Sequence, residues 1–329
     1  MHVAVVGFGA VGRRVAQSLV ADPIFDAVTI VHRDPSRVAG AVAGWSGAVQ
    51  VRRGAPGDPV AADVTVITAS GGARRAVASA LDHGSHVVCS LDDPVDVRML
   101  LDLDNRARAR RRTLAIGAAM APGLSCVMAA RMRRDFDRIE EVHVASLGTG
   151  GPACARRHHA ALAGIAVDWV DGSWRRRPGG SGRELVWFPE PVGGADCYRA
   201  ALADPLLLQP VFPECRRITS RMEATRRDRL TSWLPMLRPP HPEGLVGAIR
   251  VEMRGWLNDR AETRILGSAC PPAVAAAAVA SEAARWAVSD RMARTGAGGL
   301  AELVTDPGAF LQALAGAGVT MSAFQGSLT

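Results

Sequence analysis

A glycine-rich turn between an apolar segment and an amphipathic segment lies almost at the start of the chain. Residues Val3–Val6 are apolar and mostly β-branched, which predicts a buried strand. The sequence Gly7-Phe8-Gly9-Ala10-Val11-Gly12 follows at once, and residues 11–20 predict a helix. A strand, a glycine loop and a helix in this order are typical of dinucleotide-binding units, which restricts this part of the chain to an α/β fold.

Each glycine of the loop has a steric role in such a unit. Gly7 permits a tight turn, Gly9 lets the backbone approach a pyrophosphate, and Gly12 lets helix and strand pack closely. The helix begins at Ala10 and Val11, where free N–H groups meet the phosphates. We predict a dinucleotide-binding loop here in preference to a plain glycine-rich turn.

The rest of the N-terminal part alternates short apolar segments with amphipathic ones. Further strands are predicted at 27–31, 64–68, 86–89 and 113–116. This alternation predicts a doubly wound parallel sheet with helices on both faces. We expect a Rossmann domain over residues 1–123.

The pattern changes after Ala121-Pro122-Gly123, because strands now show a period of two. In one of them polar and apolar residues alternate, namely Arg250, Glu252 and Arg254 with Ile249, Val251 and Met253. Similar strands are predicted at 141–147, 184–188, 217–225 and 263–266. We expect an α+β substrate domain on a mixed or antiparallel sheet over residues 124–269, and a homodimer that covers the second face of this sheet.

The C-terminal part is predicted to be helical. Pro271-Pro272 starts an alanine-rich segment that can run as a helix to Arg294, where Thr295-Gly296 ends it. Asp306-Pro307 is typical of the cap and first position of a short last helix. We expect residues 270–329 to return toward the Rossmann domain.

The end of the second predicted strand bears on the choice of cofactor. NAD enzymes usually place an acidic residue about twenty residues past the glycine loop, on the ribose hydroxyls. Here that position holds His32, followed by Arg33, whose guanidinium suits a 2′-phosphate. NADP is therefore favoured over NAD. The alternative is that Arg33 is solvated and Asp34 turns inward to bind the ribose.

Composition narrows the chemistry further. The chain has no lysine and one tyrosine, Tyr198, which excludes a Schiff-base lysine and a Tyr/Lys pair. Its six cysteines form no C-x-x-C pair, so we expect no metal site and no disulfide framework. The arginines behind the net charge of +7 are scattered in twos and threes, so nucleic-acid binding is not expected. Without a run of about 18 apolar residues or a leader, we expect a cytoplasmic protein with no membrane partner.

Residues 1–130 resemble the saccharopine dehydrogenase and reductase family of NAD(P)-binding enzymes. The resemblance is carried by the 7–12 loop, by Gly84-Ser85-His86-Val87-Val88-Cys89-Ser90, and by Gly117-Ala118-Ala119-Met120-Ala121-Pro122-Gly123-Leu124-Ser125. It implies that the nicotinamide lies near Ala69, Ser70, Cys89, Ser90 and the segment Ala121-Pro122-Gly123. It also implies reduction of an imine formed from an amino acid and a carbonyl compound, or the reverse oxidation. The chain is shorter than the saccharopine-processing members, and their substrate-binding residues do not align with it, so saccharopine itself is not predicted.

Two segments offer acid/base groups for such a reaction. Asp92 and Asp93 follow the strand at 86–89 and can bind an amine or exchange a proton, although Asp93-Pro94 is equally typical of a helix cap. The segment 148–159 ends in two arginines that can clamp a carboxylate, Arg156 and Arg157, and two histidines that can shuttle a proton, His158 and His159. Vicinal histidines point to different helix faces, so at most one faces a site. The alternative is a solvated surface helix.

Two weaker candidates complete the set. The loop 177–183, with Trp174 and Trp187 nearby, is either a lid or a plain connection. Cys154 and Cys197 rank lower as nucleophiles, because nothing in the sequence indicates a lowered thiol pKa. The sequence thus predicts an NADP-dependent oxidoreductase acting on a small amino acid-like substrate. The alternative is a protein that binds NADP without turnover, as a sensor or structural partner.

Overall fold

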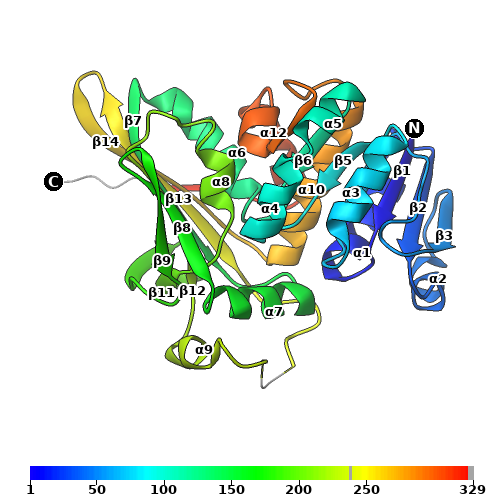
Figure 1. The fold of residues 1–329 in the computed structure, drawn as a ribbon, viewed down its shortest axis with the longest axis horizontal. Coiled ribbons are helices and arrows are strands. Elements are labelled where there is room, and N and C mark those ends of the chain that lie inside the picture. Colours follow the sequence, from blue (N-terminus) through cyan, green and yellow to red (C-terminus); the bar gives the residue numbers. More distant parts are fainter. Residues whose placement is uncertain (237–238, 325–329) are drawn as a thin grey trace.

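The N-terminal part of the chain forms a parallel sheet covered by helices. The computed structural model describes residues 1–236 and 239–324 (Figure 1). Up to residue 116 the elements are β1 (His2–Val6), α1 (Ala10–Val20), β2 (Ala27–His32), α2 (Ser36–Val42), β3 (Val49–Arg53), β4 (Val64–Ile67), α3 (Ala73–Asp82), β5 (His86–Cys89), α4 (Pro94–Leu101), α5 (Asp104–Ala109) and β6 (Thr113–Ile116). The predicted Rossmann-type domain is confirmed.

The order of the strands in this sheet creates a place for a ligand. The order is β15-β6-β5-β4-β1-β2-β3, and all pairs are parallel. The order reverses between β1 and β4, so the loops after these two strands diverge on opposite faces of the sheet. In open α/β sheets, ligands bind at the carboxyl ends of the strands beside this reversal. The loop after β1 is the glycine loop.

The second part of the chain is built on a large mixed sheet. Its elements are α6 (Leu124–Met132), the short 3₁₀ helix η1 (Arg133–Asp135), β7 (Arg138–Leu147), α7 (Pro152–Ala161), β8 (Ile165–Val170), β9 (Ser173–Pro178), β10 (Glu184–Phe188), β11 (Gly193–Arg199), α8 (Asp204–Leu208), β12 (Arg217–Glu223), α9 (Arg226–Thr231), β13 (Ala248–Leu257) and β14 (Arg260–Ala269). The main path is β10-β11-β12-β7-β13-β14-β16, and β8 pairs with β12 and β9. Strands β12 and β7 are parallel and the other pairs are antiparallel, which confirms the predicted mixed sheet.

The alternation read from the sequence explains how this sheet packs. Ile249, Val251 and Met253 of β13 are fully buried, and α6 packs against this strand. On the opposite face, Glu252 lies between Arg250 and Arg254 and pairs with both. The sheet therefore has one apolar face on the core and one charged face.

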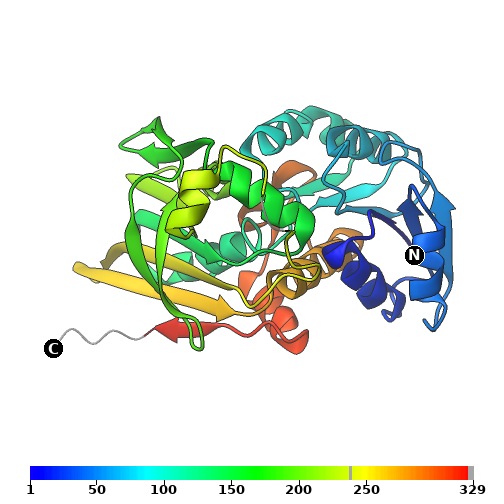
Figure 2. The same ribbon diagram turned by 90° about the horizontal axis from the view of Figure 1, so that it is seen from below.

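The C-terminal elements tie the two sheets together. They are α10 (Pro272–Val288), β15 (Gly296–Gly299), α11 (Leu300–Leu303), α12 (Pro307–Gly316) and β16 (Ser322–Phe324). Helix α10 packs against α1 and β5, whereas β16 pairs with β14 of the second sheet. Figure 2 shows α10 running between the two halves of the molecule. Helix α10 and strand β15 thus pack on the parallel-sheet part of the molecule, whereas β16 belongs to the second sheet.

Some of the predicted elements differ in the structure, and some strands were not predicted. Helix α10 ends at Val288 and not at Arg294, because the following glycine-rich segment forms β15, a buried seventh strand of the parallel sheet. Strand β3 was not predicted because it is an edge strand whose polar residues are exposed. The hairpin of β8 and β9 was not predicted either. No helix among the described residues has the length and hydropathy to cross a membrane.

Candidate active site

A cleft of about 230 Å³ lies where the two halves of the molecule meet. One wall comes from loops at the carboxyl ends of the parallel strands, and the other from the end of β7 and the start of α7. The lining residues include Gly9–Gly12, Thr68, Ser70, Ser90–Asp93, Ala119–Ala121, Ser146–Gly148, Gly150–Cys154, Arg157, His158, Pro272 and Ala276. The cleft therefore joins the predicted dinucleotide loop to both predicted acid/base segments.

The glycine loop has the steric character that its sequence predicts. Gly7 has a φ of +103°, and a Cβ there would lie 2.8 Å from the nitrogen of Ala69. A Cβ at Gly12 would lie 2.2 Å from the carbonyl oxygen of Gly7. At Gly9, by contrast, a Cβ would meet no protein atom within 4 Å. The fold itself requires the first and third glycines, whereas the second leaves open space at the N-terminus of α1.

The other predicted cofactor residues divide between the cleft and the core. Ser70 and Ser90 line the cleft, and Ala69 lies behind Gly7. Cys89 is wholly buried, with burial raising its pKa to about 12, because side chains alternate along a strand and Ser90 takes the cleft-facing position. The side chain of Cys89 therefore lies outside the cleft lining, whereas that of Ser90 is part of it.

The segment at 119–123 also differs from its prediction in detail. Pro122 and Gly123 are buried and outside the cleft, since they lead into α6, and Ala119, Met120 and Ala121 form the wall in their place. Thr68 was not predicted as a site residue, although it follows β4 at the reversal of strand order. Its hydroxyl donates to the carbonyl oxygens of Val6 and Gly7 at 3.3 Å, which holds the glycine loop.

The end of β2 lies outside the cleft, as the adenosine end of a dinucleotide site would. Arg33 is exposed there, and Arg53 is exposed at the end of the neighbouring strand β3. Asp34 accepts hydrogen bonds from the backbone N–H (3.2 Å) and hydroxyl (2.6 Å) of Ser36, and the hydroxyl bond lowers its pKa. This carboxylate is therefore engaged with Ser36 in the next turn of the chain.

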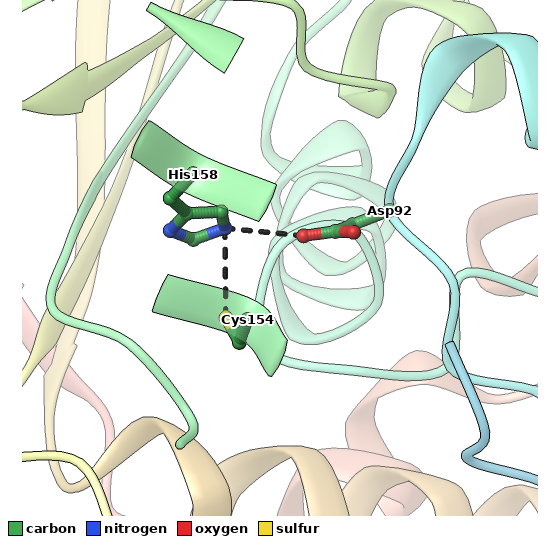
Figure 3. A group of neighbouring side chains, drawn as sticks. All are labelled: Asp92, Cys154 and His158. Atoms are coloured by element: carbon green, nitrogen blue, oxygen red, sulfur yellow. Dashed lines mark hydrogen bonds and ion pairs between the residues drawn. The ribbon is translucent and has the colours of Figure 1, made fainter. Parts of the chain in front are cut away.

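Helix α7 carries the polar side chains of the opposite wall. Gly151, with a φ of +114°, ends the loop after β7, and Pro152 occupies the first turn of the helix. Cys154 and His158 are four residues apart, so they share one helix face. That face points at Asp92, which follows β5 (Figure 3).

Asp92, Cys154 and His158 meet around a single imidazole nitrogen. The Nε2 atom of His158 lies 3.1 Å from Oδ2 of Asp92 and 3.7 Å from Sγ of Cys154. Figure 3 shows both contacts converging on this nitrogen, that of Asp92 from the loop after β5 and that of Cys154 from the same helix, α7, as His158. The side chains of His158 and Asp92 are 11% and 19% exposed, so bulk water screens the contact only weakly. These three residues are the central group of the cleft, which we call the Asp92–Cys154–His158 cluster.

The charges around the cluster favour a protonated His158 and an ionised Asp92. Burial opposes a charged imidazole, but the neighbouring Cys154 sulfur and Asp92 carboxylate raise the pKa of His158 well above its usual value. Burial likewise raises the pKa of Asp92, but the hydrogen bond and charge of His158 and the charge of Arg157 outweigh it and leave the pKa below its usual value. The geometry and the electrostatics both describe a carboxylate holding an imidazolium.

Asp93 and Arg157 support the cluster. The carboxylate of Asp93 accepts from the N–H groups of Val95 (2.8 Å) and Asp96 (3.3 Å), so it caps α4 as the alternative interpretation predicted. It also lies 3.0 Å from Nε of Arg157. The same guanidinium donates to the carbonyl oxygen of Ala201 at 2.6 Å, so Arg157 is already engaged within the protein.

The remaining candidates lie away from the cleft. The Nε2 atom of His159 lies 3.0 Å from the carbonyl oxygen of Thr231 and 3.1 Å from that of Leu234, on the other side of α7. Arg156 is exposed, and Cys197 is buried with its pKa raised to about 12 by burial. The loop 177–183 connects β9 to β10, and none of its residues lines the cleft. Of the two vicinal histidines, His158 therefore lines the cleft, whereas His159 binds backbone carbonyl groups away from it.

Comparison with known proteins gives a shared fold. No protein-family model and no curated protein sequence matches the chain. The structure is similar to saccharopine dehydrogenase (L-Glu forming) from Saccharomyces cerevisiae, with a TM-score of 0.71 and 14% sequence identity over 98% of this chain and 100% of that chain. This likeness confirms the saccharopine dehydrogenase-like fold predicted from the sequence.

Two further solved structures are more distant. A putative myo-inositol dehydrogenase from Sinorhizobium meliloti gives a TM-score of 0.46 and 12% identity over 97% of this chain and 95% of that chain. Scyllo-inositol dehydrogenase from Lactobacillus casei gives 0.44 and 12% over 80% of this chain and 75% of that chain. At scores below 0.5, neither adds to the shared fold already described.

Proposed function

We propose that this chain is an NADP-dependent oxidoreductase that acts on an imine or carbonyl group of a small amino acid-like substrate. The observation that carries the proposal is that a dinucleotide-type glycine loop and the buried His158–Asp92 pair line the same cleft. A cofactor loop alone fits a protein that binds a nucleotide without turnover. A proton donor beside that loop fits a reaction.

The glycine loop fits the pyrophosphate of a dinucleotide. Packing does not require glycine at position 9, yet a side chain there would fill the space in front of α1. No side chain caps this helix, so the N–H groups of Ala10 and Val11 are free to meet phosphate oxygens. When bound, the nicotinamide supplies or accepts a hydride at its C4. The segment Ala119–Ala121 would form the wall beside that ring.

His158 performs the proton chemistry in this proposal. Reduction of an imine or carbonyl adds a hydride to carbon and a proton to nitrogen or oxygen. His158 releases the proton held at Nε2 to that atom and later takes one from water, and in the oxidative direction it accepts the proton instead. Asp92 holds the ring in place and stabilises its charged form. Arg157, committed to Asp93 and Ala201, positions Asp92.

The end of β2 supports NADP over NAD. The exposed guanidinium groups of Arg33 and Arg53 lie at the ends of paired strands, and the acidic group nearby, Asp34, is engaged with Ser36. A guanidinium can bind a 2′-phosphate through two parallel hydrogen bonds.

Two measurements on the full chain test this proposal. Fluorescence titration with NADPH is expected to show saturable binding to one site. Oxidation of NADPH is then followed against a screen of carbonyl compounds paired with amino acids, where one pair should accelerate it. Binding without turnover by any pair would favour the non-catalytic alternative, and no binding would refute both.

We further propose that the chain forms a homodimer through the charged face of the second sheet. On this face Glu252 pairs with Arg250 and Arg254, and the exposed guanidinium of Arg254 offers a charged group that a second copy would cover. Light scattering at micromolar concentration should return twice 34.6 kDa. A mass of 34.6 kDa would refute the dimer.

A further inference from the structure

Three donor atoms of different chemistry surround one point on the cleft wall. The Oδ2 of Asp92, the Sγ of Cys154 and the Nε2 of His158 lie within 4.8 Å of one another. Two of the separations are 3.1 Å (Nε2 to Oδ2) and 3.7 Å (Nε2 to Sγ). The proton transfer proposed for His158 takes place without any bond to the sulfur of Cys154, although this sulfur lies beside the same nitrogen.

These separations match those between ligands of a zinc ion. Zinc bonds of about 2.3 Å to sulfur and about 2.0–2.1 Å to nitrogen and oxygen place tetrahedral ligands about 3.5 Å (S to N) and about 3.3 Å (N to O) apart. The observed values therefore differ from the ideal by only a few tenths of an ångström. The cysteine and the histidine sit four residues apart on α7, the spacing that lets one helix face supply two ligands.

We propose that Asp92, Cys154 and His158 form a binding site for a zinc-type divalent cation whose fourth position faces the cleft. Thiolate, imidazole and carboxylate together are the donors that zinc prefers, and the two anionic ligands neutralise its charge. Arg157 lies 3.8 Å from Oδ1 of Asp92, which leaves Oδ2 for the ion. All three ligands line the cleft, so the open position is accessible to water or a substrate oxygen.

The proposed metal site is distinct from the proposed redox function, but both use the Nε2 atom of His158. The Nε2 atom of His158 cannot hold a proton and a metal ion at once. A bound zinc ion would therefore displace the proton that the proposed reaction uses, so zinc would inhibit turnover. This consequence rests on the proposed function, whereas the binding site itself does not.

Cobalt titration tests the site directly. Co²⁺ replaces Zn²⁺ in such sites, and a cobalt–thiolate bond gives a charge-transfer absorption band. The chelator-treated full chain, without NADPH, should develop this band with one equivalent of Co²⁺, and Zn²⁺ should remove it. Cys154→Ser should abolish the band. His158→Gln and Asp92→Asn should each weaken binding by about 10- to 100-fold or more, since a lost ligand costs at least as much as a lost outer partner.

His159→Gln is the matched control, because its ring binds backbone carbonyls on the other side of the same helix. It should retain the band and the affinity. A band that survives in Cys154→Ser, or that His159→Gln weakens as much as His158→Gln, would overturn the site.

A second measurement needs no variant. Zn²⁺ should slow alkylation of Cys154 in the parent protein, located by mass spectrometry, whereas an unchanged rate together with no cobalt band would overturn the site. NADPH titration of the same chelator-treated sample tests the redox proposal separately. Normal NADPH binding without any metal response would refute the metal site alone.

Discussion

The two walls of the cleft work in different ways. The glycine-loop wall offers backbone N–H groups, and its essential residues are those without side chains, as at Gly9. The α7 wall offers side chains, Cys154 and His158, held against Asp92 from the other half of the molecule. The glycine loop of the first wall forms within one strand–loop–helix unit, whereas the second wall exists only when two distant segments pack together. The first can thus be predicted from local sequence, and the second needs the fold.

The largest effect is expected from a substitution that fills the open space beside Gly9 in the glycine-loop wall. In Gly9→Asp, a side chain and a negative charge occupy the pyrophosphate position, so NADPH binding should be abolished. The protein should stay folded, because a Cβ at this position meets no protein atom within 4 Å. Fluorescence titration and circular dichroism measure the two properties. Unchanged NADPH affinity in the folded variant would contradict the assignment of the loop.

A substitution in the α7 wall should change turnover and leave the affinity for the cofactor unchanged. His158→Gln removes the proton donor, so kcat should fall by about 10²- to 10⁴-fold, while the Kd for NADPH stays close to that of the parent. His159→Gln should leave kcat within about twofold, since its ring faces away from the cleft. Equal losses in the two variants would mean that α7 acts as a structural support only.

A substitution at the end of β2, where the adenosine of the cofactor would lie, should affect NADPH and NADH affinity differently. In Arg33→Ala the loss of one or two charge-assisted hydrogen bonds should cost NADPH binding about 2–4 kcal/mol, or about 30- to 1000-fold. NADH affinity should barely change, and His32→Asp should act in the opposite sense by adding a ribose acceptor. Parallel titrations with both cofactors check this. Equal loss for both cofactors would mean that Arg33 supports the fold or the ribose.

The smallest effect concerns Asp204, a buried acid at the start of α8 that lies between α6 and β12. The carboxyl of Asp204 accepts from Ser125 (2.6 Å) and Ser220 (3.3 Å), and burial raises its pKa from 3.8 to about 6. The folded state therefore keeps this proton to higher pH than the unfolded state. Its contribution to stability is fully present below about pH 4 and is lost as the pH rises through about 6.

The corresponding variant is Asp204→Asn. Its free energy of unfolding should depend less on pH between about 4 and 6 than that of the parent, by up to about 3 kcal/mol. Denaturant unfolding at several pH values measures the difference. If the pH profiles of the parent and the variant superimpose, Asp204 has the same pKa in the folded and unfolded states, which would contradict this prediction.

The parts that were predicted from the sequence are those set by local rules. The ends of β5 and β6 follow directly from short apolar segments bounded by turns, and Asp306 caps α12 as its sequence predicts. Two of the missed strands, β3 and β15, lack such signals, because one is a polar edge and the other is four residues of glycine and alanine. Their strand form depends on pairing with neighbours that lie elsewhere in the chain.

The site shows the same limit at the level of single residues. Asp92 and His158 were both candidates, but nothing local indicates that they meet across 66 positions of sequence, or that Cys154 joins them. Cys154 ranked low as a nucleophile because nothing in the sequence indicates a lowered thiol pKa, and it was not expected as a metal ligand because the chain has no C-x-x-C pair. The side chain of Cys89 is wholly buried, because a one-residue step along the chain turns a side chain from one face of a strand to the other.

The most direct test of the central claim, that both walls serve one reaction, is a crystal structure with NADPH bound. The account predicts pyrophosphate oxygens on the N–H groups of Ala10 and Val11, and the nicotinamide between Ala119–Ala121 and α7. A substrate carbon about 3–3.5 Å from its C4 would then lie beside His158. A nicotinamide directed away from α7, with His158 outside reach of any substrate on that ring, would contradict the account.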